Sequence, residues 1–241
     1  MICSREGGTD SKDGPLVLLL FDIDGTLLSG ATRAHSQALD RAIREVHHVD
    51  PRDLRSQIGP AGRTDGEIAR LILLDLGVSA VRIDELAADV REACCEVYAQ
   101  ICPPDLSDHV VPGMQELLPW LADRDGVTLG LVTGNFEPIA RMKLGRAGIG
   151  SWFAPGPGGF GSDSEDRTAL PAIARRRAGH VPREQAVVIG DTPRDIACAR
   201  ADGLRCVAVT TGQYGAEELA DADSVARDAG ELRVRLEELG A

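Results

Sequence analysis

The sequence predicts an α/β protein that has a mostly parallel sheet and an inserted all-helical domain. Short aliphatic runs alternate with segments of helix length from residue 16 onward, which is the pattern of an open parallel sheet covered by helices. Between the first two runs lie about a hundred residues whose apolar positions repeat at the helical period of ~3.6 residues. This segment is therefore expected to form a helical unit inserted into the α/β core.

Four aliphatic runs are the expected strands of the core. Each is too short for a helix and is apolar on both faces, as strands are when helices cover both sides of a parallel sheet. The runs cover residues 16–21, 127–132, 186–190 and 205–209. They predict a Rossmann-like core built from residues 16–28 and 112–241.

Three amphipathic stripes predict the helices of the inserted domain, which we expect to span residues 29–111. Thr64 and Glu67 have the spacing of a capping box at the start of one helix, in which each side chain caps the other's backbone N–H. Turn residues at 29–30 and 111–113 are the expected hinges to the core. The stripes cover residues 39–46, 68–76 and 86–101.

Composition narrows the class of function. The chain has 241 residues, 43% hydrophobic and 27% charged, which is typical of globular proteins. Its net charge of −12 argues against a nucleic-acid partner, and no aliphatic run approaches the ~20 residues of a membrane span, so we expect no membrane partner. Residues 1–15 are polar and are predicted to be a disordered leader, not a secretion signal. The six cysteines lack zinc-ligand spacing, which favours reduced thiols and a cytoplasmic location.

Acidic and hydroxyl side chains stand directly after three of the predicted strands. Ligands of open α/β sheets bind at the carboxyl ends of the strands, so these residues are expected to share one site. Four carboxylates on one edge repel each other unless a cation joins them, and oxygen ligands of this kind suit Mg²⁺. Mg²⁺ usually acts together with substrate phosphate, and an aspartate can attack phosphorus, so the site predicts phosphoryl chemistry. The residues are Asp22, Asp24, Thr133, Gly134, Asn135, Asp191 and Asp195.

Three motifs together resemble a known family. FDIDGTLL at residues 21–28, LVTGN at 131–135 and VIGDTPRDIACARADG at 188–203 are similar, in order and spacing, to the main signatures of the haloacid dehalogenase-like hydrolase superfamily. The resemblance extends over the chain from about residue 16 onward. The inserted helices match in position the helical cap of the phosphoglycolate phosphatase-like branch.

The resemblance implies roles for the two aspartates of the first motif. Asp22 would be the nucleophile and a Mg²⁺ ligand. Asp24 would be the general acid and base, with its backbone carbonyl on the metal. The dehalogenases of the superfamily lack an acid/base aspartate at this position, so phosphate-ester hydrolysis is favoured over cleavage of a carbon–halogen bond.

The second and third motifs supply the remaining implied roles. Thr133, the Gly134 amide and Asn135 would bind the transferring phosphoryl group. Asp191 would bind Mg²⁺, and Asp195 would hold the metal's waters or support Asp191. Phosphoryl transfer depends mainly on such positioning and charge neutralisation.

The basic residue that neutralises the phosphoryl group departs from the family pattern. Many relatives place a Lys-Pro pair ahead of the third motif, where this chain has Arg167, which we favour. Lys143 is the alternative, although it stands two turns into the helix after the second motif. Arg63, before a helix N-terminus, is a candidate for gripping a substrate anion; an exposed arginine is the other interpretation.

The glycine-rich segment and the histidines are expected to have structural and not catalytic roles. The GPGGFG segment at residues 156–161 satisfies a dinucleotide-binding pattern but follows no buried strand, so we expect a loop. The five histidines show no catalytic spacing and are expected at surface or cap positions.

These observations lead to a Mg²⁺-dependent phosphatase that hydrolyses a small phosphorylated metabolite, phosphoglycolate-like or a sugar phosphate, through an aspartyl-phosphate. A phosphomutase with the same chemistry and a catalytically idle binding protein are the alternatives. The chain is expected to be a monomer or a homodimer.

Overall fold

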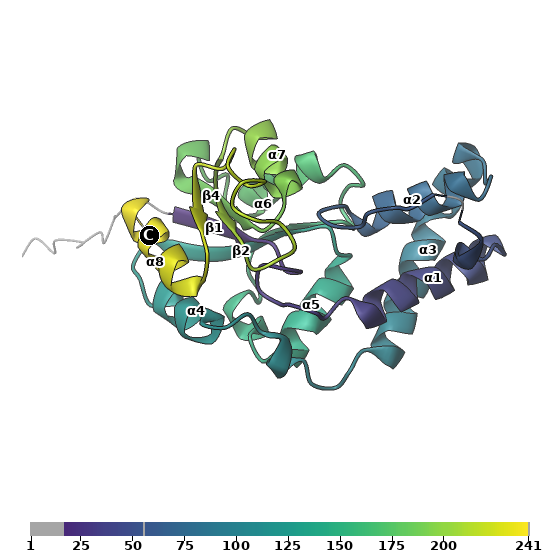
Figure 1. Cartoon of the computed structure of the whole chain (residues 1–241), viewed down its shortest axis with the longest axis horizontal. Coiled ribbons are helices and arrows are strands. Elements are labelled where there is room, and N and C mark those ends of the chain that lie inside the picture. The colour runs from purple at the N-terminus through teal and green to yellow at the C-terminus, as the bar shows by residue number, and fades with distance from the viewer. Residues whose placement is uncertain (1–16, 55, 241) are drawn as a thin grey trace, which may run out of the picture.

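A computed structural model describes residues 17–54 and 56–240; the predicted leader at 1–15 lies outside them. Six parallel strands form one sheet in the order β3-β2-β1-β4-β5-β6. Figure 1 labels three of them, β1, β2 and β4. This order places β1 at the centre, where the chain changes direction across the sheet and ligands of such folds bind. The strands are β1 (Val17–Phe21), β2 (Val127–Thr133), β3 (Gly158–Phe160), β4 (Ala186–Gly190), β5 (Arg205–Val209) and β6 (Ser224–Ala226).

The predicted α/β fold with a parallel sheet is confirmed, and two edge strands are additions to it. β3 forms inside the segment 156–161, so its interpretation as a loop was wrong for Gly158–Phe160. Three residues with two glycines carry no strand periodicity, and only pairing with β2 makes them a strand. β6 is equally short and pairs with β5 at the opposite edge.

Helices cover both faces of the sheet (Figure 1). Alternate strand residues feed two separate apolar cores: Leu19 and Phe21 belong to the core that includes α4 and α8, while Leu18 and Leu20 belong to the core that includes α6 and α7. This explains why the strands read as continuous apolar runs. These helices, with α5, are α4 (Met114–Ala122), α5 (Glu137–Arg146), α6 (Leu170–Arg177), α7 (Pro193–Ala201) and α8 (Ala229–Glu238).

Three further helices lie between β1 and α4 and pack on one another at one end of the molecule (Figure 1). The two chain segments that lead to and from them pair at Leu28 and Val110, and the backbone N–H of Val111 donates to the carbonyl of Leu27 at 3.0 Å. These paired residues lie next to the segments 29–30 and 111–113, whose role as hinges stays a prediction. The helices are α1 (Arg33–His47), α2 (Asp65–Asp75) and α3 (Ala80–Ile101).

Short 3-10 helices complete the secondary structure; they are Pro51–Asp53, Ser107–His109, Gly150–Trp152, Arg167–Ala169 and Arg183–Gln185. Across residues 17–54 and 56–240, none of the helices combines the length and apolar character needed to cross a bilayer.

Candidate active site

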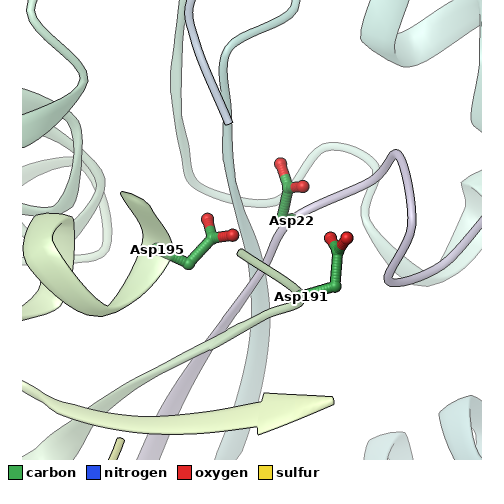
Figure 2. A group of neighbouring side chains, drawn as sticks. All are labelled: Asp22, Asp191 and Asp195. Atoms are coloured by element: carbon green, nitrogen blue, oxygen red, sulfur yellow. The ribbon is translucent and has the colours of Figure 1, made fainter. Parts of the chain in front are cut away.

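Three buried carboxylates meet at the carboxyl end of the central strands. Asp22 follows β1, Asp191 follows β4, and Asp195 lies in the first turn of α7 (Figure 2). One oxygen from each lies within 4.8 Å of the others. The parallel pairing of β1 with β4 brings the first two together, since the backbone N–H of Asp22 donates to the Ile189 carbonyl at 2.9 Å.

Asp191 lies in a cradle that has no room for additional side chains. A Cβ on Gly25 would lie 2.2 Å from Oδ2 of Asp191, and one on Gly212 would lie 1.8 Å from the same atom. Oγ1 of Thr26 donates to Oδ1 at 3.1 Å and fixes the carboxylate. The glycine of the D-x-D-G-T motif is therefore required both by its positive φ of 96° and by this close approach.

Arg167 bridges two of the carboxylates. Its Nη2 lies 3.0 Å from Oδ1 of Asp22 and also contacts Oδ1 of Asp195. The second oxygen of Asp195 accepts from the backbone N–H of Thr192 at 3.0 Å and from its hydroxyl at 2.7 Å, which completes a capping box at the start of α7. Both oxygens of Asp195 are thus engaged, so it supports the site more than it offers a free ligand.

The charge of this cluster favours a divalent cation. Three carboxylates against one guanidinium leave an excess of two negative charges when all are ionised. Burial, only partly offset by Arg167, raises the pKa of Asp22 to about 7, and burial with the charge of Asp22 raises the pKa of Asp191 to about 8. Asp22 and Asp191 are the oxygen donors that could hold Mg²⁺, because their negative charge is the least compensated.

A second buried cluster surrounds Asp24. Nζ of Lys143 donates to both carboxylate oxygens of Asp24, at 2.8 and 2.6 Å, and to Oδ1 of Asn135 at 2.7 Å. Lys143 also donates to Nδ1 of His35 at 3.1 Å, which leaves Nε2 of His35 to donate to Asp65 at 3.0 Å. Burial by itself would raise the pKa of Asp24, but the charge and hydrogen bonds of Lys143 hold it below its ordinary value.

Lys143 reaches Asp24 because of the direction of helical side chains. Its helix, α5, begins at Glu137, and side chains of an α-helix lean back toward the N-terminus. The long lysine stem therefore crosses the first turn and ends at the strand edge. Of the two basic candidates, Arg167 faces Asp22 and Lys143 faces Asp24.

Of the residues at the end of β2, one holds its neighbour in place and two line the cavity. Thr133 is fully buried, and its hydroxyl accepts from the backbone N–H of Asn135 at 3.3 Å and from Nδ2 at 2.8 Å. Gly134 and Asn135 line the cavity. A Cβ on Gly134 would lie 2.0 Å from the carbonyl oxygen of Arg63, so this glycine lets the inserted segment approach the core.

Arg63 lies at the cavity with its guanidinium already engaged. Nε donates to the Gly59 carbonyl at 3.0 Å, and Nη1 contacts Glu67. The predicted capping box of α2 is half formed: the Thr64 hydroxyl accepts from the Glu67 N–H at 3.1 Å, while the Glu67 carboxylate pairs with Arg63. The same Thr64 hydroxyl donates to the backbone carbonyl of Glu165, which belongs to the core.

A cavity of about 630 Å³ joins the two clusters. The core contributes Asp22, Asp24 and Arg167 to its wall, and α1, α2 and the loop between them form the opposite side. The inserted helices therefore face the carboxylates directly, as a cap does.

Comparison with known proteins identifies the family. Residues 19–200 match the haloacid dehalogenase-like hydrolase family. The chain belongs to this family. Membership confirms the predicted superfamily and makes the chain a hydrolase enzyme, and the curated relatives fall in the expected phosphoglycolate phosphatase-like branch.

Two curated relatives and two solved structures illustrate the similarity. This hydrolase is 29% identical over 208 residues to a phosphoglycolate phosphatase of Pseudomonas savastanoi, covering 85% of this chain and 73% of the relative. It is 29% identical over 221 residues to one of Vibrio cholerae, covering 89% and 94%. CbbY from Rhodobacter sphaeroides, in complex with phosphate, superposes with a TM-score of 0.63 at 21% identity, covering 90% and 96%. A β-phosphoglucomutase from Clostridium difficile gives 0.64 at 16%, covering 94% and 98%. The two structures show that the fold is shared.

Sequence reasoning missed His35 and Asp65 as site residues. His35 was expected at a surface or cap position; it lies in α1 of the inserted segment but is only 8% exposed and contacts Lys143. Its one signal is its place one turn before Leu39 on the buried face of α1, where a polar side chain needs a partner. Asp65 accepts from the Phe136 N–H at 2.7 Å as well as from His35, so it joins the inserted helices to the core.

Proposed function

We propose that this hydrolase is a Mg²⁺-dependent phosphatase that acts on a small phosphorylated metabolite, with the segment 29–111 as its cap and residues 16–28 and 112–241 as its catalytic core. The observation that carries the proposal is the opposite environment of Asp22 and Asp24. Asp22 lies with Asp191 in the carboxylate cluster, where a bound cation would keep it ionised, whereas Asp24 lies on the same cavity outside that cluster and accepts from Lys143. One carboxylate at a cation site and a second one bonded to a basic residue can take the separate roles of nucleophile and proton-transfer group.

In this proposal the phosphoryl group passes from the substrate to Asp22 and then to water. A carboxylate oxygen of ionised Asp22 forms a bond to phosphorus as the ester bond breaks, and the leaving oxygen takes a proton from the protonated form of Asp24, which the next step regenerates. A water molecule then attacks phosphorus and Asp24 takes its proton, which releases phosphate and restores Asp22. Lys143 stabilises the ionised form of Asp24 that takes this proton.

The other residues position and neutralise charge. Asp22 and Asp191 would hold Mg²⁺ together with the backbone carbonyl of Asp24, and Asp195 would support them. The bound ion would supply positive charge to the phosphoryl oxygens. Arg167 supplies a guanidinium next to Asp22, and its buried Nε has no protein partner among the described residues. Gly134 and Asn135, which line the cavity, are proposed to bind the phosphoryl group together with Thr133, whose hydroxyl also accepts from Asn135. Arg63 lies at the cap side of the cavity.

The relatives support a small organic phosphate as substrate, with phosphoglycolate and sugar phosphates as the first compounds to test. The proposed location is the cytoplasm, supported by five described cysteines that form no disulfide.

The test is phosphate release from a panel of phosphate monoesters, with Mg²⁺ and then with EDTA. We expect release that needs Mg²⁺ and is abolished in Asp22→Asn, because the amide is not a nucleophile. The exposed Asp89, on α3, gives the matched control: Asp89→Asn removes the same charge and should release phosphate as the wild type does. Full activity in Asp22→Asn, or in EDTA, would contradict the mechanism.

A further inference from the structure

The cap side of the cavity differs chemically from the catalytic side. The whole cavity has a volume of about 630 Å³, within the range of ~300–1,000 Å³ that holds drug-sized ligands. Four aliphatic side chains from α1, α2 and the loop between them line the cap side; they are Leu39, Ile58, Ile68 and Ile72. Such a wall favours an apolar portion of the ligand, since apolar area removed from water is stabilising.

The cap-side cation of the cavity wall is already paired. Arg63 contacts the Glu67 carboxylate and donates to the Gly59 carbonyl, so its charge is neutralised within its own helix turn. The imidazole of His35 is likewise engaged, between Lys143 and Asp65. A second anionic group on the substrate would find no uncommitted cation among the described residues that line this side.

Asp40 adds a negative charge to the same wall. It is half-buried on α1, lines the cavity, and has no hydrogen-bond or ion-pair partner among the described residues within hydrogen-bond distance. Arg44, one turn along the helix, offsets this charge only in part, because it is paired with Asp50 at 3.0 Å. A carboxylate or second phosphate on the substrate would meet both the aliphatic wall and this repulsive charge.

We infer that the substrate is a phosphate monoester whose organic part is uncharged and partly aliphatic, and that Asp40 is a specificity residue that rejects a second anion. This inference rests on the proposed phosphatase function and names the substrate class. It favours neutral alkyl or polyol monoesters over phosphoglycolate, whose carboxylate would occupy the cap side.

A matched pair of substrates tests the inference. 2-Hydroxyethyl phosphate and 2-phosphoglycolate have the same chain length and differ by a hydroxymethyl group in place of a carboxylate. We expect kcat/KM to be at least about 10-fold higher for the neutral ester, since a buried unpaired anion is costly. Asp40→Asn, which keeps the size of the side chain, should reduce this preference about 5-fold through the KM for phosphoglycolate, as expected for two charges several ångströms apart.

Glu45 provides the matched control. It is exposed on the same helix and lies outside the cavity wall, so Glu45→Gln removes one charge from α1 and should leave the preference unchanged. If neither ester is turned over, their inhibition constants against hydrolysis of p-nitrophenyl phosphate give the same comparison.

The outcomes separate this inference from the function on which it rests. Equal or better use of phosphoglycolate by the wild type overturns the inference and leaves the phosphatase intact. A preference for the neutral ester that Asp40→Asn does not change, or that Glu45→Gln changes as much, overturns the role of Asp40. No phosphate release from any ester, p-nitrophenyl phosphate included, refutes the proposed function itself and the inference with it.

Discussion

Replacing Asp191 by Asn is expected to stabilise the metal-free protein while it removes the response to Mg²⁺. Asp191 shares a buried space with Asp22 and Asp195, and one guanidinium offsets the three carboxylates. Asn keeps the shape and can still accept the hydrogen bond of Thr26. The substitution therefore removes a repelling charge without opening a cavity.

The pKa of Asp191 sets how much stability the substitution gains and how that gain depends on pH. Burial, and next the charge of Asp22, raise this pKa from 3.8 to about 8, so the folded state binds the proton more tightly than the unfolded state. Stability of the metal-free wild type must then fall as the pH rises from about 4 to about 8. At ~1.4 kcal/mol per pKa unit the limit is about 6 kcal/mol; because Asp22 and Asp191 repel each other and titrate together, only part of this cost belongs to Asp191, and we expect a gain of about 2 kcal/mol at pH 8.

Thermal unfolding in EDTA measures this effect. A gain of about 2 kcal/mol raises the Tm of a domain of this size by about 4–8 °C. The gain should nearly vanish at about pH 4, close to the ordinary pKa of the carboxyl, below which it is protonated in the unfolded state as well. Added Mg²⁺ should raise the Tm of the wild type at pH 8 and not that of Asp191→Asn. Asp89→Asn controls for the general loss of one negative charge. A lower Tm for Asp191→Asn than for the wild type in EDTA at pH 8 would refute this account of the cluster.

Three further substitutions probe other contacts. Lys143→Met leaves the carboxylate of Asp24 without its cation, so we expect a loss of about 3 kcal/mol, seen in chemical denaturation and larger at pH 7 than at pH 5; an unchanged midpoint would contradict it. Gly134→Ala pushes a methyl group against the Arg63 carbonyl, and the displaced cap segment should lower kcat/KM about 10- to 100-fold, whereas wild-type kinetics would show that the close approach is unimportant. Arg167→Met should lower kcat at least about 100-fold and Arg167→Lys less, and equal losses would mean that its positive charge has no part in turnover.

Much of the site could be predicted because its residues follow strands, and strands are recognised from the pattern of apolar residues over a few neighbouring positions. The aliphatic runs at 127–132, 186–190 and 205–209 became strands with almost the same bounds, since apolar periodicity is a local property of the chain. The carboxyl ends of adjacent parallel strands must meet, so Asp22 and Asp191 come together once β1 and β4 pair. β3 could not be predicted, because its three residues become a strand only through a neighbour.

The sequence by itself determined the α/β fold, the family signatures and the edge of the sheet at which the carboxylates meet. Only the tertiary structure decided that Lys143 contacts Asp24 and that Arg167 contacts Asp22. It also decided that His35 joins the inserted helices to this site, and that an aliphatic wall with Asp40 faces the carboxylates. The physical reason is the distance along the chain over which each feature is determined. Strand and helix periodicity follow from neighbours a few positions apart, whereas these hydrogen bonds and cavity walls depend on how helices far apart in the chain are placed to within a fraction of an ångström.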